Sequence, residues 1–422
     1  MILVSVLVAL IFLYSLVSAR LERTYLTAPI VFTTAGILLF LVVPHLRDWK
    51  ADEDLFLRVA EAGLVLLLFT DASRTDLGML RSMVTLPARL LSVGMLLTIL
   101  LGALLAVLVF PQLSLWEAGI LAAILAPTDA GLGQIIVNSP RVPMRIRQAL
   151  NVEAGLNDGL SVPFMLFFIA LAEAGSEGPR ASFAHFVVEQ LGYGVAIGGV
   201  VGVVGGWFLG LAIRGKWIAG SFVPLAVATI PLLCAVASEA ADASMFIAAF
   251  VAGLAVQVGY KEAGKHSLEF TEEWGQVFNL SIFFLFGGLV AQKWRLCSAA
   301  DVLYAVVSLT VVRMLPVALA LVGTRLSRAT VLFMGWFGPR GLASIVLGAV
   351  YIEHAGLHHG GLAIRAAVMA TVLLSIFAHG LSALPGMRWY AARLQALGPN
   401  APEHDLTSPR TPAEPQLPSP AP

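Results

Sequence analysis

The stretch APTDAGLG at residues 126–133 places a proline, two glycines and an aspartate inside a run of apolar residues that extends from 115 to 137. A second stretch, FGPRGLAS at residues 337–344, interrupts another apolar run in the same way, with an arginine as its charged residue. Proline and glycine break helices, and irregular backbone at membrane depth persists only where protein buries it or where it lines a cavity. The two stretches therefore predict two interrupted helices with a charge at each break.

Most of the chain is apolar enough to lie in a membrane. Of its 422 residues, 58% are hydrophobic and 12% are charged, whereas about 25% of the residues in soluble domains are charged. A helix that crosses the bilayer needs about 20 mostly apolar residues, and the alternating pattern of a membrane β-barrel is missing. The sequence predicts an all-α polytopic membrane protein with about thirteen transmembrane helices, at residues 1–19, 28–45, 55–71, 86–110, 115–137, 147–172, 185–213, 217–237, 241–258, 270–291, 300–323, 329–353 and 363–386.

Lysine and arginine are distributed unevenly between the predicted loops. Seventeen of them follow odd-numbered helices or lie beyond the last helix, and seven follow even-numbered helices. Basic residues accumulate on the cytoplasmic side of a membrane protein. We therefore expect a multi-pass protein of the cell (inner) membrane, with its N-terminus outside and its C-terminus in the cytoplasm. The first segment lacks the basic start of a signal peptide and is expected to remain as a helix.

The two interrupted helices are the fifth and the twelfth predicted segments, so they cross the membrane in opposite directions. A pair of broken helices in opposite orientation is typical of secondary transporters built from inverted repeats. Each break presents positive helix N-terminal ends and negative C-terminal ends. We expect Asp129 to neutralise the positive ends and Arg340 to neutralise the negative ones.

Ionisable side chains inside the predicted helices must be paired or must face water, because a charge in the bilayer costs several kcal/mol. Four acids and two bases are of this kind: Asp71, Asp129, Glu153, Asp158, Arg313 and Arg340. Glu153 and Asn157 are four residues apart and share one helix face, whereas Asp158 lies about 140° from Glu153 around the helix. We expect Glu153 to pair with Arg340, or failing that with Arg313, and Asp158 to face a cavity.

Motifs for nucleotide or metal chemistry are missing from the sequence. It has no Walker motif, no phosphate-binding glycine loop and no metalloprotease pair, and its two cysteines have no paired spacing. The chain is rich in proline, serine and alanine from about residue 396 onward, and residues 387–422 are expected to form a short cytoplasmic disordered tail. We therefore expect a secondary transporter rather than an enzyme, with no cofactor and no nucleotide or nucleic-acid partner.

Several motifs together resemble the monovalent cation–proton antiporters, in the sodium/proton exchanger (NhaP/NHE-like) branch. Thr128-Asp129 resembles the Thr-Asp motif of the first unwound helix in that family. The stretch VEAGLNDG at 152–159 resembles its Glu-Ser-Leu-Leu-Asn-Asp signature. Arg313 and Arg340 match two family arginines. The chain departs from the pattern at two neighbouring positions, Ala154 and Gly155, and at Asp71, where relatives often carry glutamate.

The resemblance implies an antiporter domain over residues 1–386, a core bundle around the helices at 115–137, 147–172, 300–323 and 329–353, and a homodimer in the bilayer. It implies exchange of Na⁺ or Li⁺ for H⁺ by alternating access, with the two ions competing for Asp158. Asp129, Thr128 and Asn157 would complete the cation site, in which Asp158 and Asp129 are the carboxylate ligands. Asp71 would be an accessory acid. Asn157 implies electroneutral exchange.

Three alternatives remain open from the sequence. A K⁺/H⁺ antiporter would have the same fold and the same motifs. A cation channel would need a continuous pore, which the pattern of Asp158 and the crossed helices does not favour. An intramembrane aspartyl protease would also use buried aspartates, but the stretches GLND and PTDA lack its Gly-Asp and Tyr-Asp motifs.

Overall fold

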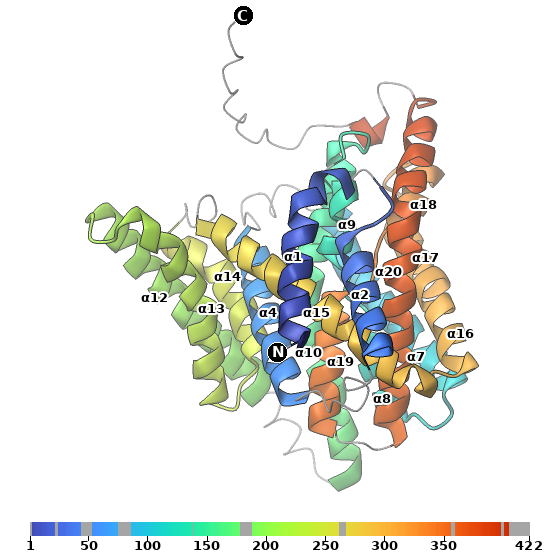
Figure 1. Ribbon diagram of the computed structural model, residues 1–422, viewed down its shortest axis with the longest axis horizontal. Helices are drawn as coiled ribbons and strands as arrows, with labels where there is room; N and C mark the ends of the chain where they lie inside the picture. Colours follow the sequence, from blue (N-terminus) through green and yellow to red (C-terminus); the bar gives the residue numbers. More distant parts are fainter. Residues whose placement is uncertain are drawn as a thin grey trace, which may run out of the picture.

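The computed structural model describes residues 2–21, 24–43, 53–74, 86–137, 139–177, 188–260, 267–355, 359–397 and 401–404. Within these ranges every regular element is a helix (Figure 1). The all-α class predicted from composition is confirmed.

Each of the thirteen predicted segments coincides with one helix or with consecutive helices. By length and composition, eight helical segments of the described chain could cross a membrane, and four shorter apolar helices accompany them; the number of crossings stays a prediction. The α-helices are α1 (Ile2–Leu21), α2 (Ala28–Val42), α4 (Glu53–Arg74), α6 (Leu86–Arg89), α7 (Met95–Val109), α8 (Leu115–Ile124), α9 (Ala130–Val137), α10 (Met144–Glu177), α12 (Gly194–Arg214), α13 (Val223–Glu239), α14 (Met245–Gly259), α15 (Ser267–Lys293), α16 (Ala299–Val307), α17 (Arg313–Ala320), α18 (Arg328–Trp336), α19 (Leu342–Ala355) and α20 (His359–Leu394).

Shorter turns of other helix types join or extend these helices. Among the described residues, three are π-helical: η1 (Leu90–Gly94), η2 (Val188–Tyr193) and η6 (Ser308–Val312). Two are 3-10 turns between the longer helices, η3 (Gly220–Phe222) and η5 (Trp294–Leu296), and a third 3-10 turn, η7 (Pro402–His404), lies near the end of the chain. The π-turns η1 and η6 lie inside the fourth and the eleventh predicted segments, so these two segments are not uniform α-helices.

The helices form two groups in Figure 1. In one group α12 packs along α14, and α14 packs along α4. In the other group α7 packs on α8, α8 on α10, and both α16 and α19 on α20. The interrupted helices belong to this second group. α9 and α18 lie toward the top of Figure 1, and α8 and α19 lie toward the bottom. The two broken helices therefore run in opposite directions.

The contact between α12 and α14 is unusually close because glycines face it. A Cβ on Gly202 would lie 2.7 Å from the carbonyl oxygen of Ala252, and one on Gly206 would collide with the carbonyl of Val256. Small residues of this kind let two helix backbones approach each other in a membrane. This stripe of glycines fixes α12 on its neighbour within the same chain.

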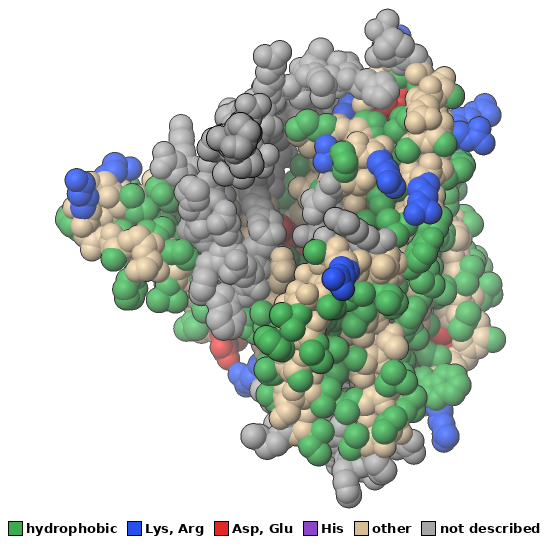
Figure 2. Space-filling model, turned by 45° about the horizontal axis from the view of Figure 1, so that its top comes forward, with side chains coloured by type: hydrophobic (Ala, Val, Ile, Leu, Met, Phe, Trp, Pro, Cys, Tyr) green, Lys and Arg blue, Asp and Glu red, His purple; other side chains and the backbone are tan. Residues whose placement is uncertain are grey.

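The outer surface has the pattern of a membrane protein. Figure 2 shows hydrophobic side chains over the lower part of the visible face and Lys and Arg side chains mainly near its upper part. Large apolar residues are strongly exposed on several helices, for example Leu16, Leu100, Leu108 and Val200. Soluble proteins rarely expose apolar patches beyond a few hundred Å². Lipid is therefore the solvent for this surface.

The prediction of a disordered tail from residue 387 is wrong in its first part. α20 continues without a break to Leu394, and η7 packs against α10. Tyr390 and Leu394 are buried in a hydrophobic cluster at this end of the bundle. The helix continues because residues 387–394 hold aromatic and aliphatic side chains at helical spacing. Residues 405–422 lie outside the described residues.

The orientation prediction rests in part on residues that the structure does not describe. These basic residues are Arg23, Arg47, Lys50, Arg81, Arg180, Lys261, Lys265 and Arg410. The placement of the N-terminus outside and the C-terminus in the cytoplasm therefore stays a prediction from the sequence.

Candidate functional site

Two helix breaks meet at the centre of the second helix group. α8 ends at Ile124 and α9 begins at Ala130, while α18 ends at Trp336 and α19 begins at Leu342. The backbone N–H of Asp129 donates a hydrogen bond to the carbonyl oxygen of Pro339, 2.8 Å away. The two interrupted helices predicted from proline, glycine and charge are confirmed, and their breaks are in direct contact.

The carboxylate of Asp129 lies between the N-terminal ends of α9 and α19. Its Oδ1 accepts from the backbone N–H of Leu132 at 2.8 Å, and its Oδ2 accepts from the backbone N–H of Leu342 at 2.6 Å. A negative charge there is stabilised by both helix dipoles. This is the neutralising role expected for Asp129. Gly341 is required beside it, because a Cβ at that position would collide with the carboxylate.

Arg340 contacts a C-terminal helix end, whereas Asp129 contacts two N-terminal ends. Its Nη1 donates to the carbonyl oxygens of Ala126 at 2.6 Å and Pro127 at 2.9 Å, just beyond the C-terminal end of α8. The side chain is fully buried. Free carbonyls at a helix C-terminus are favourable partners for a cation. The expectation that Arg340 neutralises negative ends at the crossing is therefore met for α8.

Glu153 pairs with Arg313, not with Arg340. Arg313 Nη1 lies 2.6 Å from Glu153 Oε1, and both side chains are almost fully buried. The first prediction was wrong because the Arg340 guanidinium is committed to backbone carbonyls that the sequence does not reveal. Arg313 reaches α10 past Gly338, where a Cβ would collide with its guanidinium. The fallback partner is the correct one.

Asn157 and Asp158 present unpaired oxygen atoms in the buried part of α10. Asn157 Nδ2 donates to Thr128 Oγ1 at 2.6 Å, which joins α10 to the first break. Among the described atoms, Asn157 Oδ1 and Asp158 Oδ1 are buried without a hydrogen-bond partner. Buried polar atoms are nearly always bonded. These two acceptors are therefore available to a proton donor or to a hard cation, which takes oxygen ligands.

A small cavity of about 20 Å³ lies between α9, α10 and the two helix breaks. Its polar lining comes from Thr128, Asp129, Glu153 and the backbone at Pro339, and Ala154 forms part of its wall. Such a volume holds roughly one water molecule. Asp158 does not line this cavity and is only 4% exposed. The expected opening beside Asp158 is therefore not seen in this conformation, in which its carboxylate is closed off from solvent.

Asp71, the expected accessory acid, lies beside the signature stretch. It is half-buried near the end of α4. A Cβ built on Gly155 would be 3.4 Å from the Cβ of Asp71. This distance is that of an ordinary van der Waals contact, so positions 155 and 71 are neighbours in the structure. Gly155 lies three residues before Asp158, so α10 brings both acids to one region.

Some hydrogen-bonding residues of the site were not selected from the sequence. Ser375 Oγ accepts from the backbone N–H of Arg340 at 2.6 Å and lies 3.1 Å from Nδ1 of His379. Ser344 Oγ donates to the carbonyl oxygen of Ile124 at 2.8 Å. Serines in apolar helices commonly bond to their own backbone. Their closeness in the sequence to a helix break, as for Ser344 within FGPRGLAS, is the one signal by which such serines could have been predicted to belong to the site.

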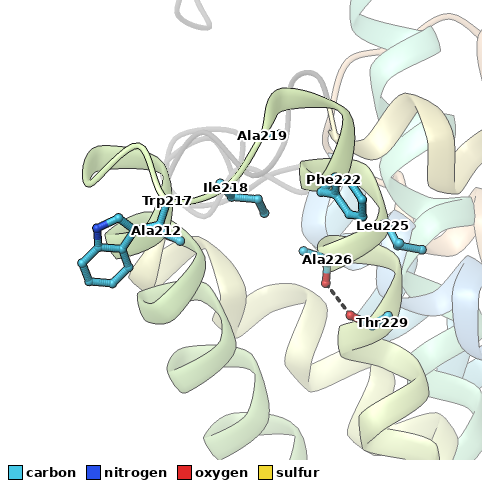
Figure 3. Close-up of a pocket in the computed structure, with 8 residues that line it drawn as sticks. All are labelled: Ala212, Trp217, Ile218, Ala219, Phe222, Leu225, Ala226 and Thr229. Carbon is cyan, nitrogen blue, oxygen red and sulfur yellow. Dashed lines mark hydrogen bonds between the residues drawn. The ribbon is translucent and has the colours of Figure 1, made fainter.

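A second hollow, of about 580 Å³, lies between the end of α12 and the start of α13 (Figure 3). Apolar side chains dominate its lining, including Trp217, Phe222 and Leu225, and the Thr229 hydroxyl donates to the carbonyl of Ala226 at 2.8 Å. No acidic or basic side chain lines it. Its chemistry does not suit an ion, so the helix breaks carry the candidate site.

Comparison with known proteins agrees with the geometry of the breaks. The family model for the transmembrane region of sodium/hydrogen exchangers matches residues 6–389. A Na(+)/H(+) antiporter of Schizosaccharomyces pombe is 27% identical over 262 residues, which are 56% of this chain and 54% of that protein. The K(+)/H(+) antiporter NhaP of Alkalimonas amylolytica is 26% identical over 393 residues, which are 90% of this chain and 66% of that protein. The chain thus spans between about half and two thirds of the length of these relatives.

Solved structures show the same fold. The sodium proton antiporter MjNhaP1 from Methanocaldococcus jannaschii at pH 8 superposes with a TM-score of 0.68 at 18% identity, over 90% of this chain and 99% of that one. The electron-microscopy structure of the same antiporter gives a TM-score of 0.69 at 19% identity, over 93% of this chain and 97% of that one. The predicted antiporter fold is confirmed.

Proposed function

Because the chain belongs to the sodium/hydrogen exchanger family, we propose that it is a secondary active antiporter that exchanges Na⁺ or Li⁺ for H⁺ across a membrane. The observation that carries the proposal is the pair of buried, unpaired oxygens on Asn157 and Asp158. A site that alternately holds a proton and a cation needs such acceptors, because the same oxygen atoms bind the proton in one state and the cation in the other.

Asp158 is the exchanging group of the proposed mechanism. Its carboxylate carries a proton or ligates a cation, but not both together, because each neutralises the same negative charge. Asn157 Oδ1 and oxygen atoms of the unwound Thr128–Asp129 segment would supply further ligands. A single proton replaces a single monovalent cation on one carboxylate, so the exchange is electroneutral.

The remaining charges hold the site in place. Both carboxylate oxygens of Asp129 accept backbone N–H groups, which leaves this residue a secondary role toward the ion. Glu153 and Arg313 fasten α10 to α17. Arg340 fixes the break of α18 and α19 to the end of α8. Asp71, beside Gly155, is an accessory acid on the path to Asp158.

The fold supports alternating access as the transport cycle. The helices of the crossing would rock as a core bundle against the group that contains α12, α13 and α14, in a homodimer, with the C-terminus in the cytoplasm. Inverted-repeat transporters expose a fixed central site to each side in turn. The closed surroundings of Asp158 suit this cycle and do not suit the continuous pore of a channel.

Exchange of K⁺ for H⁺ is the second candidate. The K(+)/H(+) antiporter NhaP of Alkalimonas amylolytica aligns over 90% of the chain. Ala154 also forms a wall of the small cavity where a serine hydroxyl would reduce the space. A roomier site with a water ligand would suit a larger cation.

The test is proton flux in proteoliposomes with an imposed pH gradient. The purified protein is challenged with Na⁺, Li⁺ and K⁺ in turn, and the initial rate of gradient dissipation is recorded for each. Sodium- or lithium-dependent flux supports the first proposal, and flux with K⁺ alone supports the second. A pH gradient that none of the three ions dissipates would refute both.

A further inference from the structure

The N-terminus of α18 has an incomplete local cap. Ser327 is the capping residue, and its Oγ accepts from the backbone N–H of Thr330 at 3.2 Å. In a capping box, the residue three positions after the cap returns a carboxylate to the backbone N–H of the capping residue. Thr330 occupies that position and has no carboxylate. The N–H of Ser327 therefore needs an acceptor from elsewhere.

Other helices of the bundle have complete capping boxes. In α8, Ser114 N–H donates to Oε2 of Glu117 at 2.8 Å, and Glu117 N–H donates back to Ser114 Oγ at 3.2 Å. In α16, Asp301 plays the same part for Ser298. α8 is the first half of one broken helix and α18 is the first half of the other. The two halves thus begin with the same device, and only α18 lacks its acid.

Glu403 supplies the missing carboxylate from the end of the chain. Its Oε1 accepts from the backbone N–H of Ser327 at 2.7 Å and from Thr330 Oγ1 at 2.8 Å. The side chain is 1% exposed. Tyr390 OH lies 3.0 Å from Thr330 Oγ1 and joins the same group. Glu403 thus does for α18 what Glu117 does for α8.

A second contact fixes the segment that carries Glu403. Arg145 Nη1 at the start of α10 donates to the carbonyl oxygen of Pro402 at 2.6 Å. The turn η7 therefore joins α10, which carries Asp158, to α18, which leads into the second break. α10 and α18 are far apart in the sequence, and the segment at η7 connects them at this end of the bundle.

We propose that Glu403 is a positioning residue for transport, which completes the cap of α18 and so sets the second helix break. α18 has nine residues and is about 14 Å long. Such a short helix moves nearly as a rigid body, so a displacement of its N-terminus also displaces residues 337–341. There the carbonyl of Pro339 holds Asp129, and Arg340 holds the end of α8. The inference rests on the proposed antiport for its transport readout.

Two truncated proteins form a matched pair for the test. One ends after residue 404 and keeps Glu403, and the other ends after residue 400 and loses it. The shorter protein is expected to exchange cations about fivefold more slowly, the size of one lost helix cap. The maximal rate should fall, and the cation concentration at half-saturation should stay the same, because Glu403 touches no atom of the ion site. Equal maximal rates in the two proteins would overturn the proposal.

A rescue separates positioning from a general effect of the chain end. Thr330→Glu in the shorter protein places a carboxylate at the third helical position, where it completes the capping box within α18 itself. This variant is expected to recover most of the lost rate without any residue beyond 400. A rescue variant that stays as slow as its truncated parent would contradict the role of the carboxylate.

Hydrogen exchange, followed by mass spectrometry on the two truncated proteins, gives a readout that does not depend on transport. The amides of residues 327–331 should exchange faster by about fivefold in the shorter protein. The amides of 114–118, whose cap is local, should be unchanged. If the full chain transports none of the three cations, the proposed function fails and the exchange data still decide the cap. Equal protection of 327–331 in both proteins overturns the inference.

Discussion

The backbone N–H of Asp129 donates to the carbonyl oxygen of Pro339 across 2.8 Å, so the breaks of two antiparallel helices are joined through their main chains. The Asp129 side chain adds a bond to α9 and another to α19. The centre of the fold is therefore held by backbone groups around one carboxylate, while Asp158, on the neighbouring helix α10, keeps a free oxygen.

Asp158→Asn is expected to abolish exchange and leave a folded protein, because an amide keeps the shape but does not take up and release a proton. Glu173→Gln is the matched control, since it removes an exposed carboxylate from the same helix. Both variants are compared by cation-dependent proton flux in proteoliposomes and by elution from a size-exclusion column. Wild-type flux in Asp158→Asn would show that another group exchanges the ions.

Glu153 and Arg313 are expected to show strong coupling in a double-mutant cycle. Breaking a buried ion pair by removing one partner typically costs about 3–5 kcal/mol, and removing both costs less than the sum. Melting temperatures are measured for Glu153→Gln, Arg313→Met and the double variant. The cycle is repeated with Arg340→Met, which should also destabilise the protein but couple more weakly to Glu153→Gln, because the Arg340 guanidinium donates to backbone carbonyls. A stronger coupling of Glu153 to Arg340 would contradict the pairing.

Gly341→Ala is expected to lower both stability and exchange, because its Cβ would collide with the Asp129 carboxylate. The cost of such overpacking is about 1–3 kcal/mol. Gly199→Ala is the control, since a Cβ at Gly199, in α12 and away from the helix breaks, meets no atom within 4 Å. Thermal melting and flux are recorded for both variants. Equal melting temperatures and fluxes for the two alanine variants would mean that the contact between the two helix breaks can relax around the added Cβ.

Protons and sodium are expected to compete. If one carboxylate serves both ions, the apparent sodium half-saturation rises as the pH falls, by up to about tenfold per pH unit in the range where the group is mostly protonated. The maximal rate at saturating sodium on both sides changes much less. Initial rates are measured against sodium concentration at several pH values. A half-saturation that is constant from acid to neutral pH would assign the two ions to different sites.

The cap provided by Glu403 should weaken only in acid. Burial raises the pKa of Glu403, but hydrogen bonds from the Ser327 N–H and the Thr330 hydroxyl outweigh burial and lower the pKa below its usual value. A depressed pKa contributes stability above the unfolded value of about 4.3, and this is lost as the pH falls through the folded pKa. The melting temperatures of the proteins that end after 404 and after 400 should differ at pH 7 and converge below about pH 4. A constant difference would indicate that the carboxylate charge does not contribute.

The sequence predicts the crossing well because its signals are local. Proline and glycine beside Asp129 and Arg340 mark both breaks, and the sign of each charge indicates which helix ends it meets. The partner of Glu153 was harder to predict, because Arg313 and Arg340 are both distant in sequence and both buried. The choice depends on Gly338, which gives Arg313 its path, and on the carbonyls that hold Arg340.

The acceptors Ser375 and Glu403 could not be identified from the sequence. Ser375 lies in a long, mostly apolar helix, and its bond to Arg340 exists only after α20 has packed on the second break. Glu403 lies in a segment whose composition is that of a disordered tail, yet its carboxylate accepts from the N-terminal cap of α18, which has no acid of its own. Composition averages over a segment, whereas one well-placed hydrogen bond can order it.

The contact between η7 and α18 decides where the protein can be modified at its C-terminal end. A fluorescent reporter or an affinity handle joined directly after Leu394 would replace the residues that reach Ser327 and Arg145. The same fusion placed after His404 leaves both contacts intact. Expression screens and microscopy of this transporter therefore need the later junction, and a signal obtained with the earlier one reports on a protein whose C-terminal end has been altered.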